Sequence, residues 1–343
     1  MVAGMRAAVT PGENVMELVE LASPGEPGVG EVMLAPEVVG VCGSDVHLFH
    51  GRLGQVFPRI QGHEISAVVQ AVGPGADRVR PGDRVAVWPV LACGQCYACR
   101  IGRENVCADI AIIGAHVDGA LQERLSVPAS QVFAVGDMAP AVTAFVEPAS
   151  IGVRTVVRAR VTAEDRVVVL GAGPIGQAVC LAARDRGAAV LLADRVPERL
   201  EHARAMGAQE VVRGDAAAVA GPLREWAGDD GVTVLIETTG VPAVVRSALE
   251  VTAPAGRLVL VALSHEDVGL PLGDFPIKEL DVLGVSCCTA DEFAHAVDLV
   301  RRHADAVARL ITDEFALEQA PDALAHVAGA PPELMKAIIR VAA

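Results

Sequence analysis

The sequence predicts a mixed α/β protein built from two parts, a β-rich part and a doubly wound parallel sheet. Residues 1–145 contain short β-like runs broken by Gly and Pro, such as "EVMLAPEVVGV", "ISAVVQAV" and "DRVAVW". From residue 166 onward, continuous apolar runs alternate with amphipathic stretches, which is typical of a parallel sheet covered on both faces. The chain has 343 residues, of which 52% are hydrophobic, so it is long enough to bury two cores.

The second part is predicted to contain six parallel strands separated by helices such as "PERLEHARAMGA". Six strands fit a doubly wound fold made of two similar halves. Beyond residue 290, "DEFAHAVDLVRRHADAV" predicts a helix and "ELMKAIIRV" predicts a final strand. The sixth run would leave an exposed sheet edge, which favours pairing with a second copy of the chain. The six runs are "RVVVL", "AVLLA", "EVV", "VTVLI", "RLVLVA" and "LDVLGV".

Composition argues against two classes of partner. The formal net charge of −15 disfavours binding to nucleic acid or to an anionic membrane surface. No run of about 18 apolar residues is free of charge and glycine, so no membrane-spanning helix is expected. The first residues, "MVAGMRAAVTPGENVMELVE", lack the pattern of a signal peptide, and we expect a cytoplasmic protein. In that reducing compartment, cysteines favour metal binding or catalysis over disulfides.

A glycine-rich turn after the first parallel strand predicts a dinucleotide site. In "VVVLGAGPIGQAV", the first glycine permits a tight turn, the second lets a pyrophosphate approach the backbone, and the third lets helix pack on strand. The helix then presents unpaired N–H groups and a partial positive charge to the phosphates. The residues of this turn that we expect to bind the cofactor are Gly171, Gly173, Pro174, Ile175 and Gly176.

An acidic residue at the end of the next strand indicates which dinucleotide binds. Asp194 lies 18 residues after Gly176, where a carboxylate binds the ribose 2′-hydroxyl and repels a 2′-phosphate. The pattern therefore favours NAD over NADP. Arg195 and Arg199 follow closely, and because an arginine can pair with a phosphate, NADP stays open as the alternative.

Four cysteines are clustered in "CGQCYACRIGRENVC", with two, two and seven residues between Cys93, Cys96, Cys99 and Cys107. Four thiolates close a tetrahedral zinc shell. An iron–sulfur run of the bacterial type would have three residues before the fourth cysteine and a proline after it, whereas Ala108 follows here. Two disulfides are disfavoured by the compartment. We therefore predict a structural zinc lobe at about residues 89–110, whose closed shell leaves no position for a substrate.

A second set of candidate metal ligands is scattered over three segments, "GVCGSDVHLFHG", "RIQGHEISAVV" and "TAFVEPASIG". A thiolate, an imidazole and one or two carboxylates suit zinc, and three protein ligands leave a place for a substrate oxygen. Spacing alone leaves alternatives open, because a cysteine at a strand end is often only buried and Gly-His-Glu is often a capped turn.

Together these motifs make the chain resemble the zinc-dependent medium-chain dehydrogenases, in particular the polyol (sorbitol-type) and sugar-acid branch. The motifs are "CGSDVH", "GHE", the four-cysteine lobe, "EP" at 147–148, "GAGPIG" and the acidic residue after the second strand. They cover essentially the whole chain. The resemblance implies a GroES-like β-rich catalytic domain at residues 1–149 and 290–343, and a Rossmann NAD-binding domain at residues 150–289.

The resemblance also implies a catalytic zinc site. Cys42 and His63 match two zinc ligands of the family, and Glu147 matches the third ligand, which is glutamate in the polyol branch. Glu64 matches a glutamate that approaches the zinc directly or stays behind the ligands. Asp45 matches the carboxylate that orients the zinc-bound histidine.

Further site residues follow from the same resemblance. Ser44 and His47 match the residues of the proton relay, and we expect Glu64 to act in catalysis as well. Arg199 matches a cofactor contact, and Lys336 lies where the family often places a basic residue near the pyrophosphate. The cofactors implied are NAD and two zinc ions per chain, one catalytic and one structural.

The sequence departs from the family pattern in two places. Ala67 replaces the glycine that usually ends "GHE-x-x-G", a small packing change on a strand. Cys287 and Cys288 stand where related sorbitol enzymes carry an arginine and an aromatic residue, which argues against sorbitol itself as substrate. The segments "FPRIQGHE" and "IGAHVDG" are closer to dehydrogenases of sugar acids such as galactonate or gulonate.

The implied activity is hydride transfer from a secondary alcohol of a polyol, sugar acid or related hydroxylated small molecule to NAD, giving a ketone. Two alternatives stay open: a threonine or amino-alcohol dehydrogenase that shares the zinc chemistry, and a non-catalytic NAD-binding sensor. The family usually assembles as dimers or tetramers, so we expect a homodimer or a homotetramer.

Overall fold

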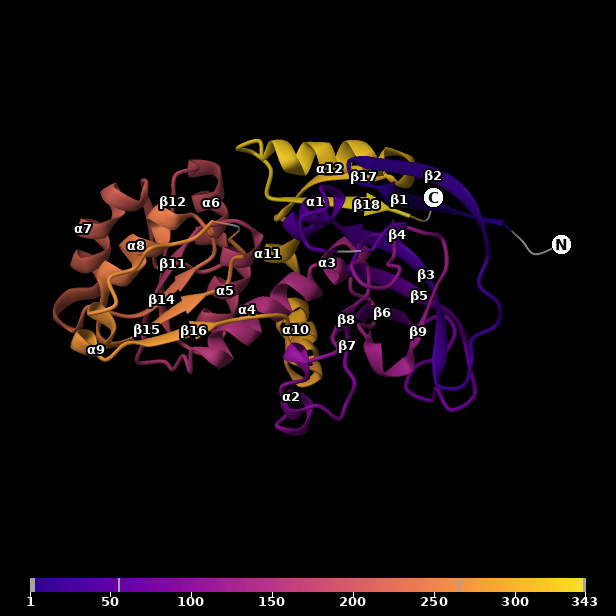
Figure 1. Cartoon of the computed structure of the whole chain (residues 1–343), viewed down its shortest axis with the longest axis horizontal. Helices are drawn as coiled ribbons and strands as arrows, with labels where there is room; N and C mark the ends of the chain where they lie inside the picture. Colours follow the sequence, from indigo (N-terminus) through magenta and orange to yellow (C-terminus); the bar gives the residue numbers. More distant parts are fainter. Residues whose placement is uncertain (1–3, 55, 265, 342–343) are drawn as a thin grey trace. The chain divides into compact units, whose positions relative to one another are not determined.

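The computed structural model describes residues 4–54, 56–264 and 266–341. The chain divides into two compact units. Unit 1 contains residues 1–147 and 289–343, and unit 2 contains residues 148–288 (Figure 1). The boundaries expected from the sequence, after residues 149 and 289, lie close to these divisions.

The described residues of unit 2 form a six-stranded parallel sheet. The strands are β11 (Arg166–Leu170), β12 (Ala189–Asp194), β13 (Glu210–Arg213), β14 (Val232–Glu237), β15 (Thr252–Leu260) and β16 (Asp281–Gly284). Their order in the sheet is β13-β12-β11-β14-β15-β16, and every neighbouring pair is parallel. This is the order of a doubly wound dinucleotide fold. All six predicted runs form strands, which confirms the fold class predicted for this part.

Helices pack on this sheet and share its core. They are α5 (Pro174–Asp185), α6 (Pro197–Ala205), α7 (Ala216–Ala227), α8 (Pro242–Val251) and α9 (Asp274–Lys278). Contacts join α5 to α6 and α7 to α8. Val168 and Leu191 of the strands pack with Leu223 of α7 and Leu249 of α8. The inner strands β11, β12 and β14 are buried over most of their length and are correspondingly apolar, whereas the edge strands β13 and β16 carry exposed charged residues.

Unit 1 contains a sheet of mixed direction and two smaller sheets. Its strands are β1 (Gly4–Gly12), β2 (Val15–Ala22), β3 (Glu31–Gly40), β4 (Arg59–Ile60), β5 (Glu64–Val72), β6 (Arg84–Val87), β7 (Val90–Leu91), β8 (Ala111–Ile112), β9 (Leu125–Pro128), β10 (Val132–Ala134), β17 (Ile311–Ala316) and β18 (Lys336–Arg340). The main sheet has the order β10-β6-β5-β3-β18-β17, and β9 also pairs with β3. The smaller sheets are β2-β1-β4 and β7-β8.

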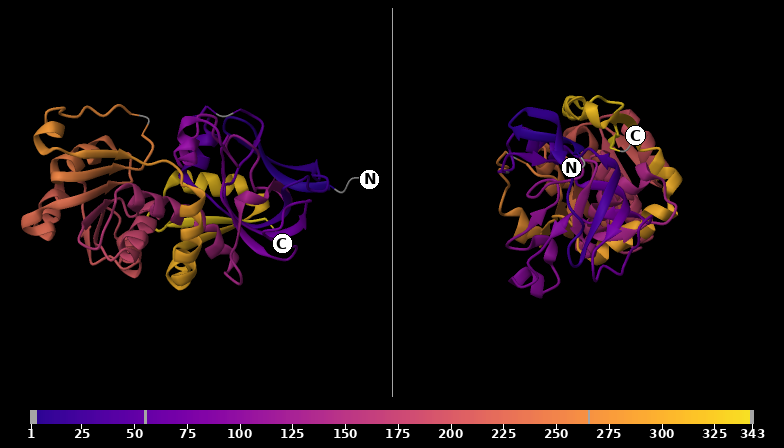
Figure 2. Two further views of the ribbon diagram at one scale, coloured as in Figure 1. Left: turned by 90° about the horizontal axis from the view of Figure 1, so that it is seen from below. Right: turned by 90° about the vertical axis from the view of Figure 1, so that its right-hand side faces the viewer.

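The strand predicted near residue 336 lies inside the main sheet of unit 1. β18 runs antiparallel to β3 and parallel to β17. Figure 2 shows this yellow segment among the indigo strands of the N-terminal part. Segments about 300 residues apart in the chain thus complete one sheet, and Val41, just after β3, meets Lys336, the first residue of β18.

Most helices of unit 1 are short, and one predicted helix differs in the structure. They are α1 (Gly43–Phe49), α2 (Tyr97–Arg100), α3 (Pro140–Ala144), α10 (Ala290–Arg302), α11 (Ala304–Ala308) and α12 (Ala320–Gly329), and α4 (Val146–Arg158) crosses the boundary between the units. The single helix expected over "DEFAHAVDLVRRHADAV" is two helices, because His303 leaves the helical conformation (φ −123°, ψ 26°). Within the described residues, no helix has the length and apolar character needed to cross a membrane.

Candidate functional site

The first candidate site lies in unit 1, where β3 ends and α1 begins. Cys42 is the N-cap residue of α1, and its backbone N–H donates to Asp45 Oδ2 at 2.9 Å. Asp45 is only 3% exposed. This hydrogen bond within one helical turn therefore fixes a buried carboxylate next to a cysteine.

His63 and Glu64 reach the same place from the start of β5. His63 Nδ1 lies 3.4 Å from Asp45 Oδ1, and His63 Nε2 lies 3.4 Å from Ser44 Oγ. Donor atoms of Cys42, His63 and Glu64 all lie within 4.8 Å of one another. The structure thus brings together Cys42 and His63, which are predicted zinc ligands, with Glu64. The resemblance left open whether Glu64 approaches the zinc directly or stays behind the ligands.

The Asp45 carboxylate acts on His63 electrostatically. Burial lowers the pKa of the His63 imidazole, but the charge and hydrogen bond of Asp45 and the neighbouring Cys42 thiol raise it, and the net pKa lies well above its usual value. A carboxylate behind a histidine fixes its ring and makes it a better metal ligand. This agrees with the orienting role predicted for Asp45.

Glu64 is held in a tight place that sequence reasoning missed. It is 1% exposed, and a methyl group on Gly40 of the paired strand β3 would lie 1.9 Å from Glu64 Oε2. Only glycine at position 40 therefore leaves room for this carboxylate. A glycine inside an apolar strand often marks such a close approach, and that was the available signal.

Lys336 contacts Glu64 in unit 1. Its Nζ donates to Glu64 Oε1 at 2.5 Å and to the Val41 carbonyl oxygen at 2.9 Å, and the residue is 4% exposed. Burial lowers the pKa of the Lys336 ammonium, but Glu64 and the Cys42 thiol raise it, and the net pKa lies above its usual value. The amino group of Lys336 is thus buried and bound to Glu64 in unit 1, and its expected contact with the pyrophosphate stays a prediction.

Glu147, the third ligand expected from the resemblance, lies near this cluster but outside the compact set. Burial raises the pKa of its carboxyl to about 7; the charges of His63 and Lys336 oppose the shift, and that of Glu64 adds to it. These effects show that its carboxyl group is close to the same charges. Within the described residues, the compact donor set is Cys42, His63 and Glu64.

The chemistry of this cluster fits a zinc ion. A thiolate, an imidazole and carboxylates are the ligands that zinc takes in proteins. Among the described residues, Glu64 Oε2 is buried without a hydrogen-bond partner, so it is available to a cation. Acidic groups also outnumber the one buried ammonium here, and a cation would offset their repulsion. We infer that Cys42, His63 and Glu64 would hold the metal, with Glu147 close by.

The predicted relay residues both lie on α1. Ser44 Oγ lies 3.4 Å from His63 Nε2, so it borders the candidate metal site. His47 is three residues further along the same helix, a spacing that places two side chains on one face. The structure therefore places Ser44 at the site and leaves the relay role of His47 as a prediction.

The four predicted cysteines form the second candidate metal site. Their donor atoms all lie within 4.8 Å of one another, and none forms a disulfide. The sulfur of Cys96 is 3.5 Å from that of Cys99 and 3.9 Å from that of Cys107, and Cys93 is 3.4 Å from Cys107. Sulfurs bound tetrahedrally at about 2.3 Å from zinc would be about 3.8 Å apart. The geometry therefore fits a closed zinc shell.

Backbone N–H groups point at these sulfurs. The N–H of Cys93 and that of Asp109 each lie 3.3 Å from Cys107 Sγ, and the Ala108 N–H lies 3.4 Å from Cys96 Sγ. Hydrogen bonds from Ala108 and Cys99 lower the pKa of the Cys96 thiol to about 6. Since the thiolate is the form that binds metal, this backbone favours metal binding.

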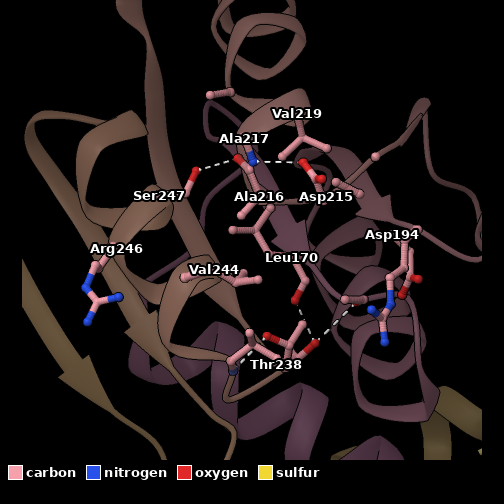
Figure 3. Close-up of a pocket in the computed structure, with 18 of the residues that line it drawn as sticks. Leu170, Asp194, Asp215, Ala216, Ala217, Val219, Thr238, Val244, Arg246 and Ser247 are labelled. Carbon is pink, nitrogen blue, oxygen red and sulfur yellow. Dashed lines mark hydrogen bonds between the residues drawn. The ribbon is translucent and has the colours of Figure 1, made fainter. Parts of the chain in front are cut away.

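The dinucleotide site predicted from the sequence coincides with a pocket in unit 2. Its volume is about 1010 Å³, and it lies at the carboxyl ends of the parallel strands, where such folds bind ligands. Figure 3 shows that side chains from β11, β12, α7 and α8 surround it. The predicted cofactor residues that line it are Gly171, Gly173, Asp194 and Arg199.

The glycine turn is built as the motif predicts. Gly171 adopts φ 99°, and a methyl group on Gly176 would lie 1.9 Å from the Gly171 carbonyl oxygen. Helix α5 begins at Pro174 with Gly173 as its N-cap residue, and Ile175 follows in its first turn. The first and third glycines thus permit the tight turn and the close packing of helix on strand.

Asp194 is held by backbone groups on both sides. Its Oδ2 accepts the Ala172 N–H at 2.7 Å and its Oδ1 accepts the Val196 N–H at 2.9 Å. The carboxylate therefore fixes the middle of the glycine turn as well as bordering the pocket. Arg195 and Arg199 also line this pocket.

Comparison with known proteins gives consistent matches over nearly the whole chain. Residues 28–137 match the alcohol dehydrogenase GroES-like domain, and residues 174–302 match the zinc-binding dehydrogenase family. The chain is 31% identical to the sorbitol dehydrogenase of Bacillus subtilis, over 98% of this chain and 97% of that protein. It is 33% identical to the 2-dehydro-3-deoxy-L-galactonate 5-dehydrogenase of Pseudoalteromonas atlantica, over 91% and 92%. It is 32% identical to the starvation-sensing protein RspB of Escherichia coli, over 93% and 94%.

Solved structures give the same picture. The short chain alcohol dehydrogenase rspB of E. coli CFT073, complexed with NADH, has a TM-score of 0.90 at 30% identity and covers 99% of this chain and 100% of that chain. A zinc-binding dehydrogenase of Sinorhizobium meliloti bound to NADP has a TM-score of 0.89 at 30% identity, with coverage of 99% and 100%. The two similar structures therefore hold different dinucleotides.

Proposed function

The chain belongs to the zinc-binding dehydrogenases that carry a GroES-like domain, and on this premise we propose that it oxidises a secondary alcohol of a polyol or sugar acid to a ketone, with NAD as the hydride acceptor. Membership of the family confirms the resemblance and the GroES-like plus Rossmann fold class predicted from the sequence. The observation that carries the proposed activity is the compact set Cys42, His63 and Glu64, of which His63 and Glu64 are buried, backed by Asp45.

This set and the residues beside it have distinct parts in the proposed reaction. Zinc held here would polarise the substrate hydroxyl and lower its pKa, and the nicotinamide would accept the hydride. Asp45 keeps the His63 ring in the orientation that binds metal. Ser44, beside His63, receives the hydroxyl proton, and His47 on the same helix passes it towards solvent.

The proposed preference for NAD over NADP rests on Asp194. Its carboxylate borders the pocket and is held there by two backbone N–H groups. A 2′-phosphate would meet this negative charge, whereas a ribose hydroxyl can donate to it. Arg195 and Arg199 line the same pocket and are the residues through which NADP would bind if it did.

Two further proposals concern the assembly of the chain and its location in the cell. We propose that the chain assembles with copies of itself, since strand β16 is one of the two edge strands of the unit 2 sheet in the described residues. We also propose a cytoplasmic location, where free thiols such as those of the four-cysteine lobe stay reduced. Neither proposal bears on the reaction.

A substrate panel tests the proposed function. Purified protein is assayed with sorbitol, galactonate, gulonate and threonine, with NAD or NADP, by the absorbance of the reduced cofactor. We expect turnover of a polyol or sugar acid with NAD, and about two zinc ions per chain by mass spectrometry. Turnover of threonine alone would favour an amino-alcohol dehydrogenase. One zinc per chain with no turnover of any substrate would favour the non-catalytic sensor.

A further inference from the structure

Asp215 lines the dinucleotide pocket of unit 2 and has no part in the proposed reaction. It is the N-cap residue of α7, and its Oδ1 accepts the backbone N–H of Ala217 at 3.1 Å and that of Ala218 at 3.0 Å. Within the described residues, no group donates a hydrogen bond to Oδ2. One oxygen therefore fixes the side chain at the start of the helix, and the other is available to a donor in the pocket.

The order of the strands gives the position of Asp215 along the pocket. The glycine turn follows β11, Asp194 ends β12, and Asp215 is the second residue after β13. These strands are neighbours in that order, and adjacent strands lie about 4.8 Å apart. The Gly214 N–H donates to the Asp194 carbonyl oxygen at 3.0 Å, which joins the ends of β12 and β13. The glycine turn, Asp194 and Asp215 therefore follow one another along the carboxyl edge of the sheet.

This order matches the order of the groups in the adenosine half of a dinucleotide. The pyrophosphate binds at the glycine turn, and the ribose binds at the acidic residue that ends the second strand, here Asp194. The base is attached to the ribose on the side opposite the phosphate. It therefore lies towards the end of the pocket that Asp215 borders.

The walls at this end of the pocket suit a purine. Val219 of α7 and Val244 of α8 line it and offer apolar surface to the faces of a base (Figure 3). Ser247 also lines it, but its hydroxyl donates to the Ala216 carbonyl oxygen at 2.9 Å. That hydroxyl proton is thus already used within the protein.

Two carboxylates on α7 and α8 remain as acceptors, those of Asp215 and Glu250. Glu250 is an exposed residue near the end of α8. Asp215 has the shorter side chain, and two backbone N–H groups hold its Oδ1 in place. Less conformational entropy is lost when a fixed group binds a ligand, so Asp215 is the better placed of the two.

The chemistry of adenine indicates what this oxygen recognises. In an adenine attached to ribose, the exocyclic amino group is the only N–H donor, and the ring nitrogens are acceptors. An ionised carboxylate only accepts hydrogen bonds. Asp215 can therefore bind adenine through the amino group alone.

We propose that Asp215 is a specificity-determining residue for the base of the cofactor. Its Oδ2 accepts a hydrogen bond from the amino group of adenine, while its Oδ1 caps α7. This role rests on the proposed NAD-dependent function.

Two cofactors with different bases test the proposal. Deamino-NAD carries a carbonyl oxygen in place of the amino group of NAD, and a proton on N1. The dissociation constants of NAD and deamino-NAD are measured by calorimetry for the wild-type protein and for each variant. We expect the wild-type protein to bind NAD about tenfold more tightly, because in deamino-NAD the carbonyl oxygen would meet the carboxylate.

Two substitutions of Asp215 keep the helix cap and change the second oxygen, since Asn and Ser are both good N-cap residues. In Asp215→Asn the amide oxygen caps α7 and the NH₂ group replaces Oδ2, so deamino-NAD should bind at least as tightly as NAD. Asp215→Ser removes the second acceptor, so the two cofactors should bind within about twofold of each other. Glu250→Gln makes the same change from carboxylate to amide elsewhere on the pocket wall and should keep the wild-type preference.

Each outcome decides the matter. Loss of the preference in both Asp215 variants, with Glu250→Gln unchanged, supports the proposed role. Equal binding of the two cofactors by wild-type protein, or an unchanged preference in Asp215→Asn, overturns it. So does an equal loss of both affinities, which would show that Asp215 only caps α7, and so does loss of the preference in Glu250→Gln. If Asp215→Asn does not fold, Asp215→Ser is judged by the same criteria. Wild-type protein that binds neither cofactor would instead refute the proposed function.

Discussion

Replacing Lys336 by methionine removes a buried ammonium next to the candidate catalytic metal site. Lys336 and Glu64 are 4% and 1% exposed, and their charged atoms are 2.5 Å apart. At an effective dielectric constant of about 20, such charges attract by about 7 kcal/mol. Methionine avoids the free-energy cost of taking an ammonium out of water, which offsets part of this attraction. The net cost of removing one partner of a buried ion pair is about 3–5 kcal/mol. We therefore expect Lys336→Met to lower the free energy of unfolding of the metal-free protein by about 3–5 kcal/mol.

Zinc should reduce the loss. A zinc ion bound by Glu64 supplies positive charge to the same carboxylate, so we expect the cost of Lys336→Met to fall below about 2 kcal/mol in zinc-loaded protein. The measurement is urea-induced unfolding followed by circular dichroism, with zinc or with a chelator. Wild type and variant are compared within each condition, so any effect of the chelator on the four-cysteine lobe cancels.

The other lysine of the chain supplies the control. Lys278 Nζ donates to the carbonyl oxygens of Leu249, Glu250 and Thr252, at 2.9, 3.0 and 3.1 Å. These acceptors carry no charge, so Lys278→Met should cost about 1–2 kcal/mol, with or without zinc. The reasoning would be refuted if Lys336→Met lost no more than this control in the metal-free protein, or if zinc left its loss unchanged.

Four further outcomes are expected. Cys96→Ser should lower the zinc content from about two ions to one per chain by mass spectrometry, and unchanged content would exclude the lobe as a metal site. Asp194→Asn places an amide NH₂ against backbone N–H donors, so the KM for NAD should rise about tenfold, and an unchanged KM would contradict the role of this carboxylate. Gly40→Ala should weaken zinc binding about 10–100-fold in a competition titration, because the methyl group displaces Glu64, and wild-type affinity would count against the tight fit. Burial raises the pKa of the Cys180 thiol to about 12. Iodoacetamide at about pH 9 should therefore label Cys180 only after unfolding, and labelling of native protein would contradict this.

The fold of unit 2 could be predicted because its signals are local. Each strand of a sheet covered on both faces must be apolar throughout, and the run at 166–170 is followed directly by the glycine turn that starts α5. Unit 1 carries weaker local signals. Its strand β3 contains Pro36 at an irregularity of pairing, and its completion by β18 depends on a partner far along the chain. Only the resemblance to a family predicted that return.

The candidate metal site was predictable in composition but not in arrangement. Cys42 and His63 were identified from motifs, and the structure brings their donor atoms together. Whether Glu64 or Glu147 completes the compact set depends on packing that spacing does not encode. The contact of Lys336 with Glu64 joins residues 272 positions apart, so no local pattern indicates it.

The insertion of unit 2 within unit 1 has a consequence for synthesis on the ribosome. Unit 2 is a continuous segment, so it can fold as soon as it emerges, as domains generally do during translation. Unit 1 cannot complete its main sheet at that stage, because β18 is translated after all of unit 2, and until then residues 38–40 of β3 lack the strand that pairs with them there. Such an edge invites pairing with other chains. The nascent polypeptide is therefore most prone to aggregate while the inserted unit is being made, and Lys336 reaches Glu64 only after that interval.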